Sequence, residues 1–325
     1  MQRAGEGAGD KARGIRDVII VGGGPAGLTA GIYLARARMD VVMWEKEAPG
    51  GAPALTERIE NYPGFPEGIS GWELVDRMRR QAEGFGLAVR SFHPMKGLRR
   101  EEGHLVVMGD EGEEAAHAVI LAMGMRPAKL GVPGEEEYHG RGVSYCATCD
   151  GAFFKDSVVA VVGGGNSAVE EALFLTRFAS KVILIHRRDR LRASRILQER
   201  ILQHPKAEIR WKRVVREIRG DGKRVQSVVI GSTDTGEVEE IPVQGVFLYV
   251  GNVPNTEEVR GFLELDDSGF IVTDGELETS ERGVFAAGDV RKGSVWQVAA
   301  AVGDGVRAAL NAQRYVEELK GIAYR

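Results

Sequence analysis

The chain has 325 residues, of which 43% are hydrophobic and 28% charged, and its formal net charge is -4. This length predicts two domains, and the small negative charge excludes the basic surface that nucleic-acid binding requires. The polar, glycine-rich residues 1–14 are predicted to be disordered, and the apolar run Val18–Val21 is too short for a signal peptide or a membrane span. We therefore expect a cytoplasmic protein that binds neither nucleic acid nor a membrane.

The first predicted element is a buried strand at Arg16–Val21, which a glycine-rich turn joins to a helix at Leu28–Ala37. In that turn, Gly22 allows the tight bend, Gly24 lets the backbone approach a pyrophosphate, and Gly27 permits close packing of helix on strand. Unpaired amides at the start of the helix favour phosphate groups. The dinucleotide contacts expected here are Gly22, Gly24, Pro25, Ala26 and Gly27.

Further along the chain, Cys146 and Cys149 are the only cysteines, and two residues separate them. This spacing lets both sulfurs reach one disulfide or one metal ion, but no second CxxC and no closely spaced histidine pair supplies the other ligands of a zinc site. We therefore expect a redox-active pair and no metal. Asp150, which directly follows Cys149, is either a general acid to a departing thiolate or the cap of a turn or helix.

The pattern of strand, glycine turn and helix returns at Ser157–Val162 and Val169–Phe178. One such fingerprint can arise from turn and packing requirements alone, whereas two copies, each between a strand and a helix, indicate two nucleotide sites. The second turn adds further expected cofactor contacts: Gly163, Gly165, Asn166, Ser167 and Ala168.

The end of the following strand distinguishes the two sites, because the ribose 2′ position is recognised there. Glu45 follows Gly22 at the same spacing as His186 follows Gly163. A carboxylate suits the free 2′-hydroxyl of FAD or NAD, whereas the arginine-rich segment His186–Arg192 suits the 2′-phosphate of NADPH. These charges would otherwise mark a solvated helix start, but their register with Glu45 argues against that explanation.

A dithiol beside two dinucleotide sites is the arrangement that an electron relay requires. NADPH delivers a hydride, a disulfide takes up two electrons, and a flavin can accept the first and reduce the second. The sequence therefore predicts an oxidoreductase in which FAD stands between NADPH and the pair Cys146 and Cys149.

Taken together, these motifs resemble the bacterial-type, low-molecular-weight thioredoxin reductases, which are NADPH-dependent flavoprotein disulfide reductases, over nearly the whole chain. The resemblance rests on the runs GGGPAG, CATCD, GGGNSAVEEA, HRRDRLR, YVGNVPNT and VFAAGDV. It implies an α/β fold with two Rossmann-like nucleotide-binding domains, the NADPH domain being inserted into the FAD domain. The implied FAD domain is 1–125 with 253–325, and the implied NADPH domain, which carries the cysteines, is 126–252.

The resemblance also implies roles for individual residues. Cys149 would contact the flavin, while Cys146 would attack the disulfide of thioredoxin or a thioredoxin-like protein, and the chain would form a homodimer. The implied FAD contacts outside the glycine turn are Glu45, Gly51, Asn61, Gly124, Gly288, Asp289, Trp296 and Gln297. The implied NADPH contacts beyond the second turn are His186, Arg187, Arg188 and Arg192.

Two departures from the family pattern lie near the predicted flavin site. Ala52 follows Gly51 where the family commonly has Gln, and Trp296 stands where it commonly has Arg. Trp296 would either stack beside the isoalloxazine or lie in the core, and a lone aromatic in an apolar run favours the core. The departures leave open a related flavoenzyme with a different donor or acceptor, such as a small disulfide, ferredoxin or peroxide. A sensor that binds both cofactors without turnover is the remaining alternative.

Overall fold

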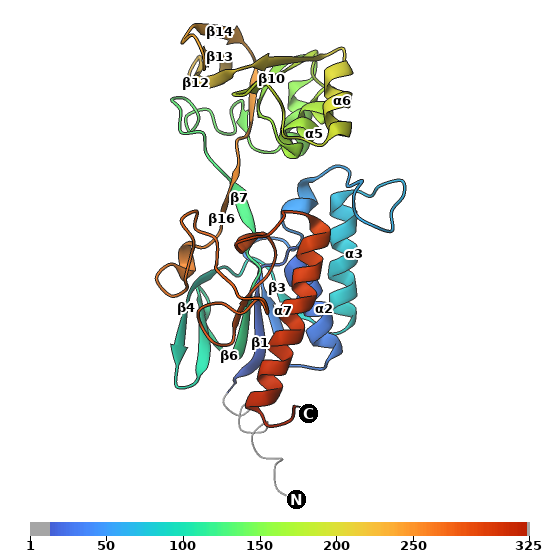
Figure 1. The fold of residues 1–325 in the computed structure, drawn as a ribbon, viewed down its shortest axis with the longest axis vertical. Helices are drawn as coiled ribbons and strands as arrows, with labels where there is room; N and C mark the ends of the chain where they lie inside the picture. The colour runs from blue at the N-terminus through green and yellow to red at the C-terminus, as the bar shows by residue number, and fades with distance from the viewer. Residues whose placement is uncertain (1–13, 324–325) are drawn as a thin grey trace, which may run out of the picture. The chain divides into compact units, whose positions relative to one another are not determined.

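The structure, a computed structural model, describes residues 14–323. The segment 1–13, for which the sequence predicts disorder, lies outside the described residues. The chain divides into two compact units (Figure 1): unit 1 is Met1–Arg126 with Val253–Arg325, and unit 2 is Pro127–Asn252. Unit 2 is therefore a single segment inserted into the sequence of unit 1.

Within the described residues, unit 1 contains a seven-stranded sheet in the order β3-β2-β1-β6-β5-β4, with β17 also paired to β6. The strands β3, β2, β1, β6 and β17 run parallel to one another, and β5 pairs antiparallel with both β4 and β6. The strand bounds are β1 Arg16–Val21, β2 Val41–Trp44, β3 Ala88–Arg90, β4 Met95–Glu101, β5 His104–Gly109, β6 Gly112–Leu121 and β17 Val284–Ala286.

Helices α2 (Pro25–Arg36), α3 (Gly71–Gly84) and α7 (Val298–Leu319) stand together beside this sheet (Figure 1). They bury one apolar cluster against it, to which both α2 and α7 contribute many alanine side chains. These small residues let the two helices approach closely, and an added Cβ on Gly305 of α7 would lie 2.3 Å from the carbonyl oxygen of Ala26. The short helices of this unit are η1 Ala52–Leu55, η3 Glu257–Val259 and η4 Gly288–Val290.

In the described chain, unit 2 combines a five-stranded parallel sheet, ordered β11-β10-β9-β15-β8, with a three-stranded antiparallel sheet, β12-β13-β14. Its strands are β8 Val143–Ser144, β9 Val158–Gly163, β10 Lys181–His186, β11 Ala207–Trp211, β12 Arg213–Gly220, β13 Val225–Ser232, β14 Val238–Pro242 and β15 Gly245–Tyr249. Its helices are α4 Ala147–Asp150, η2 Gly151–Phe154, α5 Asn166–Leu175 and α6 Arg195–Gln203.

Both units contain a buried parallel strand that a glycine turn joins to a helix, which is the Rossmann arrangement. The predicted α/β fold with two such units is therefore confirmed. The two crossings between units contain strands β7 (Met125–Pro127) and β16 (Asn252–Pro254), which pair with each other in a two-stranded sheet.

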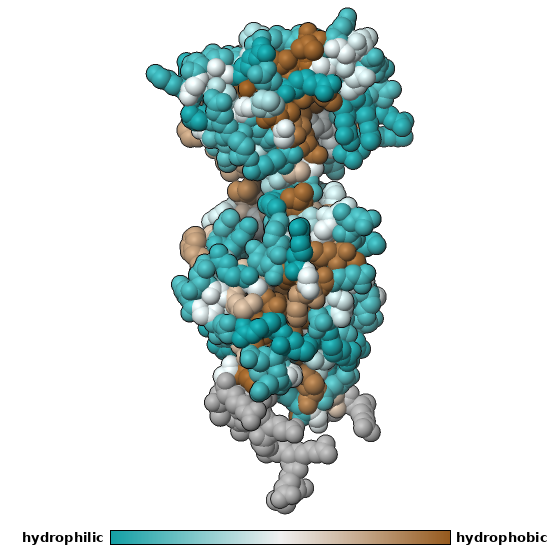
Figure 2. All heavy atoms as spheres, turned by 90° about the vertical axis from the view of Figure 1, so that its left-hand side faces the viewer, coloured by the Kyte–Doolittle hydropathy of each residue, from teal (hydrophilic) through white to brown (hydrophobic). Residues whose placement is uncertain are grey.

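The surface is mainly hydrophilic on the face drawn in Figure 2, and the apolar side chains gather there in limited patches. Among the large apolar side chains that remain exposed, Phe153 of unit 2 is 82% accessible. No helix in residues 14–323 combines the length and the apolar character that a membrane crossing needs.

Candidate redox and nucleotide-binding sites

The first glycine turn lies between β1 and α2. An added Cβ on Gly27 would lie 1.9 Å from the carbonyl oxygen of Gly22, so only glycine allows this approach of helix to strand. The helix begins with Gly24 as N-cap, without a side-chain cap and without an acidic residue in its first turn. An added Cβ on Gly24 would meet only the Cα of Gly51, at 3.9 Å. The turn therefore has both the room and the electrostatic character to hold a pyrophosphate.

Glu45, which follows β2, is fixed at the edge of this turn. Its side chain is largely buried, its Oε2 accepts the Gly23 amide at 2.6 Å, and its Oε1 accepts the Glu47 amide at 2.8 Å. A carboxylate oxygen can accept more than one hydrogen bond, so both oxygens retain capacity for ribose hydroxyls. The structure thus brings Glu45 to the first turn, where its negative charge disfavours a 2′-phosphate.

The segment Gly288–Asp289 from the end of the chain lies beside the same turn. An added Cβ on Gly288 would lie 3.0 Å from the Cβ of Ala26. Asp304 of α7 holds this segment in place, because it accepts the Gly288 amide at 3.1 Å and pairs with Arg291 at 2.7 Å. Burial, reinforced by the Asp304 carboxylate, raises the pKa of Asp289, although a hydrogen bond from Ser294 acts in the opposite direction.

The other predicted flavin-side residues lie in loops of unit 1. Asn61 donates a side-chain hydrogen bond to Gln297 at 2.9 Å, and the Gly124 carbonyl accepts the Asn255 amide at 3.1 Å. Trp296 is 49% exposed and stacks on Phe270, with 6.1 Å between ring centroids. The prediction that Trp296 lies in the core is therefore wrong. The Trp296 backbone has a φ of 53° and lies just before α7, so its side chain is not part of the buried face of that helix.

In unit 2, the second glycine turn is packed against His186, the last residue of β10. An added Cβ on Gly164 would lie 2.3 Å from the His186 ring, whereas one on Gly165 would meet nothing within 4 Å. The ring nitrogens of His186 lie 2.9 Å from the carbonyl oxygens of Gly163 and Arg190. Burial lowers the pKa of His186, and these two carbonyl contacts offset part of that effect. The imidazole thus links the glycine turn to the segment that follows β10.

Further hydrogen bonds fasten the arginine-rich segment to the turn. The Arg192 amide donates to the Gly164 carbonyl at 2.7 Å, and the Ser194 amide donates to Asn166 Oδ1 at 2.8 Å. The side chains of Arg187, Arg188 and Arg192 are exposed, and none forms an ion pair with a carboxylate among residues 14–323. Helix α6 begins only after this segment, so the explanation of these charges as a helix start is wrong.

Cys146 and Cys149 form a disulfide, with 5.3 Å between their Cα atoms. The Cys149 amide donates to Cys146 Sγ at 3.2 Å, and the buried Ser144 hydroxyl accepts the Cys146 amide at 3.0 Å. Cys149 is exposed and Cys146 is partly buried. After reduction, the amide that already points at Cys146 Sγ would stabilise a thiolate on that sulfur.

Asp150 closes the short helix that carries the pair, and its amide donates to the Cys146 carbonyl at 3.2 Å. It is also the N-cap residue of η2, but its side chain makes no capping hydrogen bond there. The interpretation of Asp150 as a helix cap through its side chain is therefore wrong.

Sequence reasoning missed two tyrosines that bind the surroundings of the pair. Tyr249, the last residue of β15, accepts the Ala147 amide at 2.8 Å, and Tyr145 donates to Glu135 Oε1 at 2.6 Å. Tyr249 lies in the YVGNVPNT run, which was the only signal for it. Tyr145 directly precedes Cys146, but a tyrosine in that position predicts no particular chemistry.

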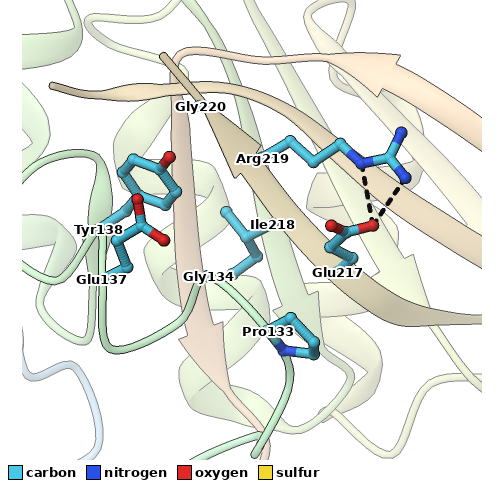
Figure 3. A pocket seen from close by; sticks show the side chains of 8 residues that line it. All are labelled: Pro133, Gly134, Glu137, Tyr138, Glu217, Ile218, Arg219 and Gly220. Carbon is cyan, nitrogen blue, oxygen red and sulfur yellow. Dashed lines mark hydrogen bonds and ion pairs between the residues drawn. The ribbon is translucent and has the colours of Figure 1, made fainter. Parts of the chain in front are cut away.

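A separate hollow in unit 2 contains none of the predicted residues. It lies between the loop that carries Pro133 and Tyr138 and the end of β12 (Figure 3). Its one guanidinium, that of Arg219, pairs with Glu217 and Glu240 at 2.7 Å each. The lining also contains the carboxylate of Glu137, and none of these charged side chains belongs to the predicted sites.

Two glycine turns, one beside a carboxylate and one beside exposed arginines, together with a disulfide in CATCD, define a nucleotide-dependent disulfide oxidoreductase. The chain belongs to the pyridine nucleotide-disulphide oxidoreductase family, whose sequence pattern matches residues 16–305. This membership confirms the predicted oxidoreductase class and the predicted cofactors, FAD and NADPH.

Particular members of that family resemble the chain over almost its full length. It is 49% identical over 306 residues to a thioredoxin reductase of Listeria innocua, and the matched region covers 94% of this chain and 95% of that protein. It is 47% identical over 306 residues to a thioredoxin reductase of Bacillus subtilis, and the matched region covers 94% of this chain and 96% of that protein. The crystal structure of Lactococcus lactis thioredoxin reductase superposes with a TM-score of 0.91 at 44% identity, covering 93% of this chain and 99% of that one.

Proposed function

We propose that the chain is a thioredoxin reductase, which uses NADPH and FAD to reduce its Cys146–Cys149 disulfide and then the disulfide of thioredoxin or a thioredoxin-like protein. The observation that carries this proposal is that the redox pair lies on the same unit as the second glycine turn, to which the arginine-rich segment is hydrogen-bonded. The full-length similarity to thioredoxin reductases supports it. A homodimer in the cytoplasm completes the proposal: the homodimer rests on the family resemblance, and the location rests on the apolar run Val18–Val21, which is too short for a signal peptide or a membrane span.

In this proposal unit 1 is the FAD domain and unit 2 is the NADPH domain. The carboxylate of Glu45 and the open space at Gly24 fit FAD, and the unpaired arginines and the open space at Gly165 fit NADPH. When bound, the flavin supplies a two-electron carrier between a hydride donor and a disulfide. The proposed FAD-binding residues are Gly22, Gly24, Pro25, Ala26, Gly27, Glu45, Gly51, Asn61, Gly124, Gly288, Asp289, Trp296 and Gln297. The proposed NADPH-binding residues are Gly163, Gly165, Asn166, Ser167, Ala168, His186, Arg187, Arg188 and Arg192.

The dithiol form of the pair then carries out disulfide exchange. The Cys146 thiolate, stabilised by the Cys149 amide, attacks one sulfur of the partner disulfide, and the other partner sulfur leaves as a thiolate. Cys149 next attacks Cys146 Sγ, which restores the intramolecular disulfide and releases the second partner sulfur. Two electrons move to the partner, and two protons follow. The role proposed for Asp150 is to hold one of these protons at its carboxyl group.

The full-length similarity to thioredoxin reductases favours a protein acceptor over a small disulfide or peroxide. A small disulfide would need only access to the sulfurs. The unpaired arginines likewise favour NADPH over ferredoxin as the electron donor.

The test is to mix the purified protein with NADPH and an oxidised acceptor under anaerobic conditions and to follow NADPH absorbance. We expect a yellow protein that NADPH bleaches and that thioredoxin reoxidises, with rapid NADPH consumption. Rapid turnover with a small disulfide or peroxide and none with thioredoxin would reject the proposed acceptor. Flavin reduction by ferredoxin and not by NADPH would reject the proposed donor, and bleaching without reoxidation by any acceptor would indicate a sensor.

A further inference from the structure

The short helix α4, which carries the redox pair, is held at its first residue by a side chain from a distant strand. Ala147 is completely buried, and its amide donates to the Tyr249 hydroxyl at 2.8 Å. Tyr249 ends β15, where it is in register with Gly163 of the second glycine turn. A buried amide is costly when it lacks an acceptor, so this hydroxyl has a defined task in holding α4.

The Glu171 carboxylate belongs to α5, the helix that follows the second glycine turn, and lies close enough to the Tyr249 hydroxyl to act on its pKa. Burial raises the pKa of Tyr249, and the Glu171 carboxylate raises it further, both through its charge and as a hydrogen-bond partner. Asp150 adds to this effect from α4. The phenol therefore keeps its proton at all ordinary pH values, so it can donate to Glu171 while it accepts from Ala147.

We propose that Tyr249 is a positioning residue for the redox pair, which fixes the first turn of α4 against α5 and so keeps the Cys149 amide directed at Cys146 Sγ. This inference rests on the proposed function only in taking Cys146 and Cys149 as the reacting groups. Tyr249 touches neither sulfur by any hydrogen bond within residues 14–323. Its influence passes through the backbone of α4, which the Ser144 hydroxyl holds from the other side.

The variant Tyr249→Phe removes the hydroxyl and keeps the ring. With the Ala147 amide left without its acceptor, the first turn of α4 should loosen and the amide should hold the Cys146 thiolate less well. Losing most of one hydrogen bond to a charged group corresponds to a change of about tenfold in an equilibrium. We therefore expect alkylation of Cys146 near pH 7 to slow by about tenfold in this variant.

The experiment uses the full chain with its flavin, reduced with dithiothreitol, freed of excess reductant without oxygen and treated with iodoacetamide over a series of pH values. Mass spectrometry then reports alkylation at each cysteine. Tyr145→Phe is the matched control, because it removes the same atom from the neighbour of Cys146, whose hydroxyl bonds to Glu135 and not to α4. The control should keep the wild-type profile, and the rate of flavin reduction by NADPH should be unchanged in both variants.

Two results would overturn the proposal: a wild-type alkylation profile in Tyr249→Phe, or an equal change in Tyr145→Phe. If Tyr249→Phe does not fold, amide hydrogen exchange of the wild-type protein decides, since the Ala147 amide should exchange slowly and fast exchange would contradict its bond to Tyr249. Failure of the proposed function would look different. A wild-type protein that does not turn over with thioredoxin still gives an alkylation profile, because that measurement uses no acceptor.

Discussion

The double substitution Arg187→Gln and Arg188→Gln tests how the second site recognises its nucleotide. Both guanidinium groups are exposed, and neither pairs with a carboxylate in the described part of the chain, so a 2′-phosphate would be their first strong partner. Glutamine retains a side chain of similar reach but loses the charge. The fold should not change, because the hydrogen bonds that fasten this segment use backbone atoms of Arg188, Arg190, Arg192 and Ser194, which glutamine at positions 187 and 188 leaves in place.

A hydrogen bond between charged groups is worth about 1.5–3 kcal/mol, and exposure to solvent places these two at the low end of that range. Their joint loss is then about 3 kcal/mol, which corresponds to roughly a hundredfold in affinity. NADH lacks the 2′-phosphate, so its binding should hardly change. We therefore expect KM for NADPH to rise about a hundredfold while KM for NADH and kcat with either nucleotide stay nearly constant.

The assay is steady-state disulfide reduction with NADPH and with NADH as donors, from which the ratio of the two values of kcat/KM is taken. Arg190→Gln serves as the control, because Arg190 lies in the same exposed segment but takes part through its backbone carbonyl. An unchanged preference for NADPH in the double variant would refute the reasoning and would assign recognition of the 2′-phosphate to another segment. An equal loss in Arg190→Gln would show that only the total charge of the segment matters.

The remaining predictions concern the first glycine turn, the redox pair and the buried acid of unit 1. Gly27→Ala should give a protein that is purified without yellow colour, because the new Cβ would lie 1.9 Å from the Gly22 carbonyl oxygen; full flavin absorbance would contradict this. Cys149→Ser should abolish disulfide reduction and leave flavin reduction by NADPH intact in stopped-flow measurements, and an equal loss of both would reject the relay. Asp289→Asn should stabilise the FAD-free protein at pH 7 but not near pH 3. The pKa of Asp289 is higher in the folded protein than in the unfolded chain, where it is about 3.9. The folded protein therefore loses stability as the pH rises from the unfolded pKa through the folded pKa, and the Asn variant, which does not titrate, avoids that loss. Thermal melts at both pH values check this, and a gain that is equal at both would be evidence against it.

Much of the fold could be predicted from local patterns. The first strand has the predicted bounds, Arg16–Val21, because a run of apolar β-formers is distinctive. Helix α2 begins at Pro25 and not at Leu28, since proline suits the first turn although it breaks the apolar period that indicates a helix. Helix α5 likewise begins earlier than predicted, at Asn166. The two crossings between the units contain the paired strands β7 and β16, which the glycine and proline residues there do not indicate.

The candidate sites could likewise be predicted only in part from the sequence. Equal spacing in two copies of one motif predicted the different characters of Glu45 and His186, because spacing along a repeated strand and turn is preserved in space. Contacts between distant segments leave no such pattern, which is why the hydrogen bonds from the Ala147 amide to Tyr249 and from Arg291 to Asp304 could not be predicted. The exposure of Trp296 was also beyond the sequence, because a left-handed residue before α7 turns an apolar run out of the core.

The insertion of unit 2 into unit 1 has a consequence for the order in which the chain can fold during synthesis. Strand β17 pairs with β6 only after residues 122–283 have been made, and α7, which covers α2, is made later still. Unit 2 is one continuous segment, so it can form its core while the ribosome still holds the C-terminal residues. The first glycine turn emerges before unit 2, yet Gly288, Asp289 and the α7 residue Asp304 reach it only after unit 2 has been made. A chain that stops before α7 would therefore contain an intact unit 2 beside an open, flavin-free unit 1, and such a fragment is what quality control in the cell would meet.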